Sequence, residues 1–359
     1  MPVTILYVKK LDNYKERPLY GASRKVIRLR KSILDLQLLS NPTMSNSLVF
    51  ITGGTGFIGA HTVQSLLEAG YRVRLSIRRP EQDAIVKKRY PKFASALETV
   101  LVKDFSDPES FKEGLAGAEH VIHLATPMPD RSGTDFRKDF AEPAVNATLA
   151  ILKAALNFPQ IKKVLVMSSS VALLPVIPVD FDAEFAPGLM GQVVKYSASK
   201  IVAHQATRDF VKEKKPNYTL ITLHPTYVMG HDLTQETAEG LGGINSLLWA
   251  SLGSEKPLLG TSWIHVQDVA DAHVKALEAN VEHGKEFLLS GPSFAWEDAI
   301  QYIWNKYPDL GVKLVPPFEG KWTVDVTGAE TILGLKWRPK ELILDEVIGQ
   351  QLALGNKLP

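Results

Sequence analysis

The segment "LVFITGGTGFIGAHTV", residues 48–63, decides how this chain folds. It begins with an apolar run typical of a buried parallel strand, passes through Gly53, Gly56 and Gly59, and continues with a helical pattern. Glycines at such positions allow a tight turn and the close approach of a pyrophosphate, and the helix N-terminus supplies free N–H groups. The segment therefore predicts a nucleotide-binding turn rather than an ordinary strand–helix connection.

The chain beyond this turn alternates between strand and helix patterns. Strand-like segments occur at 71–78, 99–104, 120–126, 162–170 and 218–225, and helical patterns at 58–69, 139–157 and 196–213. Such alternation predicts an α/β fold with a Rossmann-type, doubly wound parallel sheet.

The alternation weakens after residue 225, where glycine, tryptophan and proline become frequent. We expect a nucleotide-binding domain formed by 46–225 together with about 263–290. Residues 226–262 and 291–359 then form a smaller C-terminal lobe that binds the substrate.

A basic segment precedes the first strand. Residues 1–43 hold nine basic and three acidic residues, a charge of +6, although the whole chain has a net charge of only +2. We interpret residues 1–45 as an extension outside the core of the fold. Met44 offers an alternative start, and an organelle signal is the less favoured interpretation because acidic residues are present.

The composition excludes several classes of protein. The chain has no cysteine, which rules out disulfides, thiol nucleophiles and cysteine-ligated metals and fits a cytoplasmic protein. Its nine histidines show no clustered ligand spacing, so no metal site is expected. No apolar run approaches the length needed to cross a membrane, and the mildly acidic body gives no reason to expect nucleic-acid binding. The expected partner is a small molecule.

Two arginines indicate which nucleotide binds. An NAD site usually has an acidic residue about 20 residues beyond the glycines, where it accepts hydrogen bonds from the ribose. This chain has Arg78 and Arg79 in that region instead. A guanidinium can bind a 2′-phosphate through two hydrogen bonds, so the pair favours NADP(H).

A tyrosine and a lysine in "KYSASK" suggest the chemistry. Tyr196 and Lys200 are four residues apart and therefore lie on one face of a helix. A nearby ammonium group favours phenolate, which would let Tyr196 exchange a proton with a carbonyl or alcohol oxygen. The serines at 168–170, at the end of a predicted strand, can supply a hydroxyl for the same oxygen.

Together these features resemble an extended short-chain dehydrogenase/reductase of the NAD-dependent epimerase/dehydratase superfamily. The similar segments are "TGGTGFIG" (52–59), "VIHLATP" (121–127), "YSASK" (196–200), "HPTYVMG" (224–230), "WIHVQDVADAHVKALE" (263–278) and "LGLKWRPKELILD" (333–345). Within the superfamily, Arg78 and "HLATP" look most like the dihydroflavonol-4-reductase-like branch, which includes plant flavonoid reductases and yeast aldehyde and ketone reductases.

The resemblance implies reversible hydride transfer between NADPH and an aldehyde or ketone. Tyr196 would be the acid, and Lys200 would lower its pKa and hold the ribose. Ser170 matches the family pattern best as the serine that binds the carbonyl, with Ser169 as the alternative, and Asn146 would support the lysine through water. The cofactor contacts implied by the resemblance are Gly53, Thr55, Gly56, Phe57, Ile58, Gly59, Arg78, Asp104, Phe105, Ala125, Thr126, Tyr196, Lys200, His224, Pro225 and Val228.

One departure from the family limits the substrate prediction. The segment between the serines and Tyr196, residues 171–195, is about ten residues shorter than the corresponding segment usually is in this branch. Loop lengths commonly vary between related proteins. The missing part ordinarily forms some of the pocket wall, so a more open pocket is expected, or one closed by residues 233–262.

Other functions of the same superfamily are the competing interpretations. One is an NAD- or NADP-dependent epimerase, dehydratase or hydroxysteroid-dehydrogenase-type enzyme. Because Arg78 and Arg79 favour NADP(H), they argue against those of these enzymes that use NAD. Another is a non-catalytic protein that senses NADP, which the intact Tyr–Lys pair disfavours. Members of the family occur as monomers and homodimers, and either is expected here.

Overall fold

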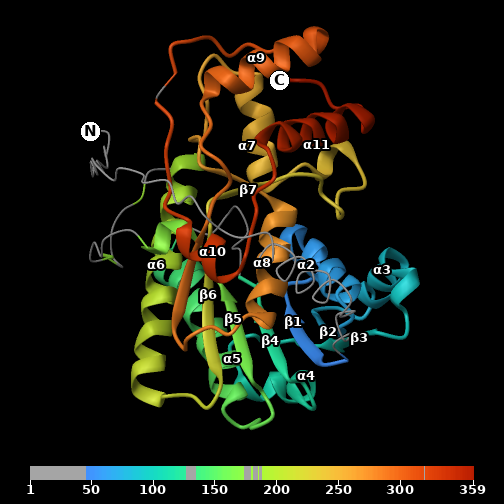
Figure 1. Ribbon diagram of the computed structural model, residues 1–359, viewed down its shortest axis with the longest axis vertical. Coiled ribbons are helices and arrows are strands. Elements are labelled where there is room, and N and C mark those ends of the chain that lie inside the picture. The colour runs from blue at the N-terminus through green and yellow to red at the C-terminus, as the bar shows by residue number, and fades with distance from the viewer. Residues whose placement is uncertain (1–45, 127–134, 174–178, 181–184, 186–187, 319) are drawn as a thin grey trace, which may run out of the picture. The chain divides into compact units, whose positions relative to one another are not determined.

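The computed structural model describes residues 46–126, 135–173, 179–180, 185, 188–318 and 320–359 (Figure 1). All of them belong to one compact unit, Ser45–Pro359. The predicted extension 1–45 lies outside the described residues.

Seven parallel strands form the central sheet. They are β1 (Leu48–Thr52), β2 (Arg72–Ile77), β3 (Leu97–Leu101), β4 (His120–His123), β5 (Lys163–Met167), β6 (Thr219–Pro225) and β9 (Lys285–Leu289). Their order is β3-β2-β1-β4-β5-β6-β9, so the direction of winding reverses between β1 and β4. This order confirms the predicted doubly wound fold, and ligands bind such sheets at the carboxyl ends of the strands near the reversal.

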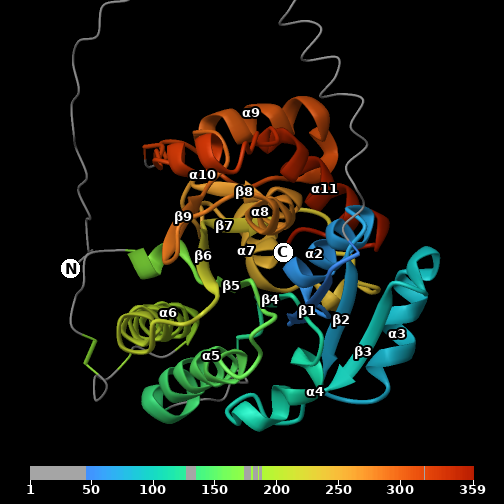
Figure 2. The ribbon, with the colours of Figure 1, turned by 60° about the horizontal axis from the view of Figure 1, so that its bottom comes forward.

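Helices cover both faces of the sheet, as Figure 2 shows. On one face, α2 (Phe57–Glu68) packs against α8 (Val266–Glu278). On the other face, α5 (Glu142–Ala155) packs against α6 (Gly188–Lys214). Side chains of β1 alternate between the two apolar cores, with Val49 and Ile51 in one and Leu48 and Phe50 in the other. A strand buried on both faces explains why its sequence is an unbroken apolar run.

Shorter elements fill the connections. They are α3 (Gln82–Arg89), η1 (Pro91–Phe93), η2 (Pro108–Phe111), α4 (Lys112–Leu115), the π-turn η3 (Arg137–Ala141) and η4 (Ser170–Leu173). Asp107 caps η2, since its side chain accepts a hydrogen bond from the Glu109 N–H, and Pro108 occupies the first position of the turn.

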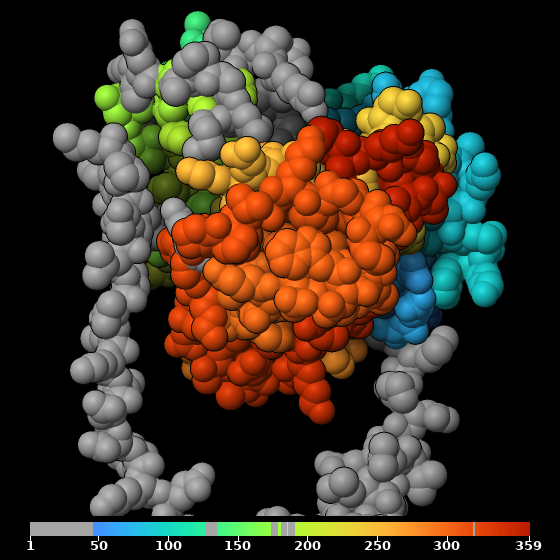
Figure 3. All heavy atoms as spheres, turned by 90° about the horizontal axis from the view of Figure 1, so that it is seen from above, coloured from blue at the N-terminus to red at the C-terminus, as the bar shows by residue number. Residues whose placement is uncertain are grey.

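The C-terminal lobe has its own core. A small parallel sheet of β7 (Tyr227–Met229) and β8 (Trp263–His265) is accompanied by α7 (Gly243–Leu252), α9 (Trp296–Lys306), α11 (Lys340–Ala353) and the turns η5 (Ala238–Gly240) and η6 (Pro308–Leu310). The short helix α10 (Thr327–Ile332) packs instead on β9, and Ala329 belongs to a core of the central sheet. Trp249, Trp263 and Trp296 are buried together in the core of the lobe, so they stabilise the lobe rather than line a pocket. Seen from above in Figure 3, the orange and red segments of this lobe make up most of the face.

The structure moves one predicted strand. The pattern "TVLVKD" predicted a strand at 99–104, but β3 spans 97–101, because its pairing with β2 runs from Val73–Leu97 to Ile77–Leu101 and ends where β2 ends. The strand β9 and the helices α3 and α8 were not predicted as separate elements. No described helix has both the length and the apolar character needed to cross a membrane.

A buried carboxylate ties the two parts of the unit together. Asp268 of α8 is 1% exposed and accepts hydrogen bonds from the Arg338 backbone N–H, at 3.0 Å, and from its guanidinium. The same guanidinium reaches Asp271 at 2.8 Å on the solvent side. Burial raises the pKa of Asp268, and the bonds to Arg338 oppose that rise. The link therefore connects α8 to the segment that leads into α11.

We expect Asp268→Ala to lower the free energy of unfolding by about 3 kcal/mol, because it removes one partner of a buried ion pair. Asp271→Ala is the matched control and should cost about 0–1 kcal/mol, since that carboxylate is partly solvated. Urea unfolding followed by circular dichroism measures both. Equal losses in the two variants would contradict the special role of the buried carboxylate.

Candidate active site

The glycine turn brings the backbone of β1 close to the chain that follows β4. Gly53 has a φ of +75°, and a Cβ there would lie 2.6 Å from the Ala125 backbone nitrogen. A Cβ on Gly59 would lie 2.1 Å from the Gly53 carbonyl oxygen. Both contacts are impossible for any other residue, so these two glycines set the path of the turn.

The helix that follows the turn begins without a side-chain cap. Gly56 is the N-cap residue of α2, is exposed, and makes no side-chain capping bond, and the first turn of α2 holds no acidic residue. Thr55 precedes this cap, and Phe57 and Ile58 form the first helical turn, partly buried against the core. The N–H groups and positive end of the helix dipole therefore remain available to a phosphate.

Arg78 is held at the carboxyl end of β2. Its guanidinium carbon lies 5.4 Å from the centre of the Phe105 ring, and the backbone N–H groups of Arg78 and Arg79 donate to Gln82 Oε1. Asp104 is exposed beyond the end of β3 and accepts hydrogen bonds from the Ser106 backbone and hydroxyl. The arginine thus presents a positive charge beside an aromatic ring on the side of the sheet where β2 and β3 end.

The predicted tyrosine and lysine lie on α6, with Tyr196 partly buried and Lys200 5% exposed. Lys200 Nζ lies 5.8 Å from the centre of the Tyr196 ring and donates to Thr126 Oγ1 at 2.7 Å. The lysine therefore joins α6 to the chain after β4. Ala125, close to Gly53, and Thr126, bonded to Lys200, thus connect the glycine turn with this lysine, and their contact with a cofactor stays a prediction.

The electrostatics of the pair differ from the prediction. Burial raises the pKa of Tyr196 to about 12, and a hydrogen bond with the Ser169 side chain opposes the rise. Burial lowers the pKa of Lys200 to about 8. We predicted that the ammonium group would lower the pKa of Tyr196, but desolvation raises it and favours the neutral phenol, while Lys200, with a pKa of about 8, stays mainly charged at neutral pH.

The two candidate serines lie where the chain leaves β5. The Ser169 side chain opposes the rise in the pKa of Tyr196, and the Ser169 carbonyl oxygen lies 3.1 Å from His224 Nδ1. Ser170 begins the turn η4. Ser170, with Ser169 as the alternative, stays the predicted carbonyl-binding serine.

The structure corrects the prediction for Asn146. Its side chain is exposed on α5, while Ala144 and Thr148 of the same helix line a small cavity beside Lys200. Asn146 is two residues from each of them, and two residues turn a helix by about 200°. It therefore faces away from the lysine that it was predicted to support.

His224 also differs from its predicted role. It is completely buried, with Nε2 2.8 Å from Thr222 Oγ1 and Nδ1 3.1 Å from the Ser169 carbonyl oxygen. Both nitrogens are thus engaged within the protein, and burial lowers the pKa of the ring to about 3. His224 positions the serine segment rather than facing a cofactor. Pro225 and Val228 are buried nearby, Val228 within the main core.

Sequence reasoning missed the histidines behind the lysine. His123 ends β4 and His204 lies one helical turn beyond Lys200, and both line the small cavity. The spacing of Tyr196, Lys200 and His204, each four residues apart, could have identified His204. Nothing local marks its ion-pair partner, Glu286, which is 82 residues away.

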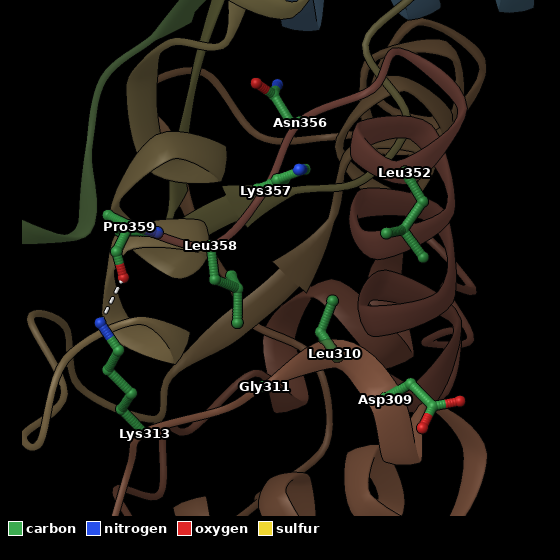
Figure 4. A pocket seen from close by; sticks show the side chains of 9 residues that line it. All are labelled: Asp309, Leu310, Gly311, Lys313, Leu352, Asn356, Lys357, Leu358 and Pro359. Atoms are coloured by element: carbon green, nitrogen blue, oxygen red, sulfur yellow. Dashed lines mark hydrogen bonds between the residues drawn. The ribbon is translucent and has the colours of Figure 1, made fainter.

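A larger hollow lies elsewhere in the lobe. Its volume is about 450 Å³, and Figure 4 shows its lining around η6 and the last residues of the chain. Lys313 Nζ donates there to the Pro359 carbonyl oxygen at 2.7 Å. None of its lining residues belongs to the set around Tyr196, so this hollow is distinct from the candidate active site.

Comparison with known proteins gives concordant similarities. A family model described as the NAD dependent epimerase/dehydratase family matches residues 49–290. The ketoreductase sphI of Aspergillus fumigatus is 36% identical over 87% of this chain and all of that protein. The putative NADPH-dependent methylglyoxal reductase GRP2 of Candida albicans is 30% identical over 75% of this chain and 86% of that protein.

A solved structure shows the same similarity in three dimensions. The crystal structure of Gre2 from Candida albicans in complex with NADPH superimposes with a TM-score of 0.73 at 25% identity. The alignment covers 86% of this chain and all of that one. The similarity therefore extends over the sheet and the lobe together.

We expect Gly59→Ala to destabilise the protein by more than 2 kcal/mol, because its Cβ would overlap the Gly53 carbonyl group. Gly349→Ala, in the interior of α11 where a Cβ meets nothing within 4 Å, is the control and should stabilise by about 0.5–1 kcal/mol. Thermal unfolding of both variants measures the difference. A tolerated alanine at residue 59 would show that the turn is not as tightly packed as described.

Proposed function

Because the chain belongs to the NAD dependent epimerase/dehydratase family, we propose that it is a carbonyl reductase in which Tyr196 donates the proton. Its relatives carry the names ketoreductase and NADPH-dependent reductase, and the chain is an NADP-dependent oxidoreductase that acts on carbonyl or alcohol groups. The observation that carries the proposal is the position of Tyr196 beside the buried Lys200, whose Nζ lies 5.8 Å from the centre of the phenol ring.

The described residues fit NADP(H). The uncapped N-terminus of α2 would hold the pyrophosphate, and Arg78 on Phe105 would hold the 2′-phosphate. Ala125, Thr126 and Lys200 would contact the nicotinamide end, and the approach of Ala125 to Gly53 and the bond between Thr126 and Lys200 support this. When bound, the reduced cofactor supplies the hydride that adds to the carbonyl carbon.

The two hydroxyls would act together on the carbonyl oxygen. Ser170, with Ser169 as its alternative, and Tyr196 can each donate a hydrogen bond to this oxygen, and both bonds strengthen as the oxygen gains negative charge. A tyrosine with a pKa of about 12 is fully protonated at neutral pH, which is the form an acid needs. Because an alkoxide is a stronger base than a phenolate, the proton then moves from Tyr196 to the product.

The reverse reaction, oxidation of an alcohol, requires a different protonation state of Tyr196. Oxidation of an alcohol needs phenolate at Tyr196, and a charged Lys200 would favour it. Because burial holds Tyr196 in its neutral form, we propose that the site favours reduction, with alcohol oxidation promoted as pH rises. Small aldehydes and ketones such as methylglyoxal are the first substrates to test.

Several predictions from the sequence remain proposals. Part of the shortened segment that would form the pocket wall, 174–178, 181–184 and 186–187, lies outside the described residues. We retain the division into a nucleotide-binding domain and a lobe, the monomer or homodimer, and the cytoplasmic location as proposals. Reversibility and membership of the dihydroflavonol-4-reductase-like branch are proposals of the same kind.

Substitution of the hydroxyls tests the mechanism. We expect Tyr196→Phe to lower kcat/KM by about 10²–10⁴-fold and Ser170→Ala by about 10²-fold, since they remove the acid and one donor to the developing charge. Ser169→Ala, the matched control, should change kcat/KM by less than about fivefold. NADPH oxidation with a panel of aldehydes and ketones measures the rates. A larger loss at residue 169 than at 170 would give the role to Ser169, the alternative.

The arginine determines the choice of cofactor in this proposal. Arg78→Gln should weaken NADPH binding by about 10²-fold and leave NADH binding nearly unchanged, because a charged pair to the 2′-phosphate is lost. Arg79→Gln is the control, since it is the Arg78 guanidinium that stacks on Phe105. Fluorescence titration with each nucleotide gives the affinities. Equal kcat/KM for NADH and NADPH in the unmodified protein would contradict the proposal.

A further inference from the structure

Gln82 is the first residue of α3 and holds the turn that follows β2. Its Oε1 accepts hydrogen bonds from the backbone N–H groups of Arg78, at 2.8 Å, and of Arg79, at 3.1 Å. The Gln82 N–H donates in return to the Arg79 carbonyl oxygen at 3.1 Å. Because backbone N–H groups can only donate, they fix the side-chain amide with its oxygen toward the turn.

The amide nitrogen of Gln82 makes no hydrogen bond with any described residue, although the side chain is partly buried. It is bonded to the same carbon as Oε1 and therefore lies close to the backbone of Arg78 and Arg79. The amide thus offers two N–H groups whose orientation is set before a ligand arrives. A donor held in this way loses little conformational freedom on binding, which favours a ligand that carries acceptor oxygens.

The guanidinium of Arg78 indicates which ligand this is. Arg78 is exposed at the end of β2 with its guanidinium over the Phe105 ring, and in the proposed function it binds the 2′-phosphate of NADP(H). A phosphate group has three strong acceptor oxygens. A guanidinium binds two of them in its bidentate geometry, so the phosphate can accept further bonds from a donor on the same turn.

Two nearby carboxylates already have partners of their own. Asp83 accepts a hydrogen bond from Thr99 Oγ1 at 2.6 Å and forms an ion pair with Lys87 at 2.9 Å. Asp104 accepts hydrogen bonds from the backbone N–H and the hydroxyl of Ser106. The side chain that is held against the turn is therefore the neutral amide of residue 82, and not a carboxylate that would repel a phosphate.

The alternative is that Gln82 only shapes the turn. Glutamate would do this at least as well, since an ionised acceptor makes the stronger hydrogen bond with an N–H group. It would also place a negative charge beside Arg78, in the region where an NAD site carries its acidic residue. Glutamine keeps the acceptor, adds two donors and brings no charge. These are the properties that a bound phosphate requires of its neighbour.

We propose that Gln82 determines cofactor specificity: its Nε2 donates to the 2′-phosphate of NADP(H) while its Oε1 holds the turn. The inference rests on the proposed function, in which Arg78 binds the same phosphate. Arg78 supplies the positive charge, and Gln82 supplies an uncharged donor that is already oriented. NADH has no 2′-phosphate, so Gln82 contributes to the affinity for NADPH alone.

The first experiment changes one atom of the amide. Gln82→Glu keeps the size of the side chain and the acceptor for the turn, but it replaces the donor by a negatively charged oxygen. By fluorescence titration, NADPH should bind at least about tenfold more weakly, whereas the affinity for NADH should change by less than about threefold. The ratio of the two affinities therefore measures the role of the amide.

Ala84→Glu is the matched control for this charge. Ala84 is exposed on α3, and two residues turn a helix by about 200°, so the same charge is added on another side of the helix. The ratio of affinities should change by less than about threefold in this variant. An unchanged ratio in Gln82→Glu overturns the proposal. Equal weakening of both nucleotides indicates a distorted turn and overturns it as well, and so does an equal change of the ratio in the control.

The second experiment observes the contact directly and needs no variant. A crystal structure of the unmodified protein with NADP⁺ should place Gln82 Nε2 within about 3.2 Å of an oxygen of the 2′-phosphate. Oε1 should still accept hydrogen bonds from the N–H groups of Arg78 and Arg79. An amide nitrogen that faces solvent in this complex overturns the proposal. So does a phosphate that takes the two backbone N–H groups from Oε1.

Both experiments measure binding, so they do not depend on turnover. If no aldehyde or ketone is reduced but Gln82→Glu changes the ratio as expected, the proposed reductase function fails and the role of Gln82 stands. If Arg78→Gln weakens NADPH binding and Gln82→Glu does not, only the role of Gln82 is wrong. The two failures are therefore distinguishable.

Discussion

The structure depends on the close approach of the glycine turn to the chain beyond β4. No side chain fits between Gly53 and the Ala125 backbone, so the end of β1 is held against the residues that follow its neighbouring strand. Thr126 comes next along the chain and accepts a hydrogen bond from Lys200, which links α6 to this segment. Tyr196 lies on the same helix, one turn before Lys200. One steric constraint thus brings a nucleotide turn and a proton donor into one site.

Burial has a second consequence at this site, because it acts on both ionisable groups. It raises the pKa of Tyr196 to about 12 and lowers that of Lys200 to about 8, so the phenol is neutral and the lysine mainly charged at neutral pH. A phenol in this state can give a proton to a carbonyl oxygen but has to regain one afterwards. Among the described residues, the same burial leaves His123 Nε2 and His204 Nδ1 without hydrogen-bond partners.

The lobe contributes to this arrangement mainly through its own core. Its tryptophans pack with one another and with α11, separately from the two cores that cover the sheet. Asp268 and Arg338 connect it to α8, which lies beside the nucleotide-binding helix α2. A lobe stabilised independently can change its surface without disturbing the glycine turn or α6. This independence is consistent with a family in which related reductases act on different carbonyl compounds.

Much of the fold and site follows from the sequence by itself, because local patterns determine it. The strand–glycine–helix pattern defines the turn, the i, i+4 spacing places Tyr196 and Lys200 on one face of α6, and Arg78 comes at the end of β2. Only the tertiary structure decided the features that depend on the direction in which a side chain points or on contacts between residues far apart in the chain. It turned Asn146 away from Lys200, engaged both nitrogens of His224, and paired His204 with Glu286 on a distant strand. The physical reason is that a side chain's partners, and the burial that shifts its pKa, come from segments far apart in the chain, which no local pattern records.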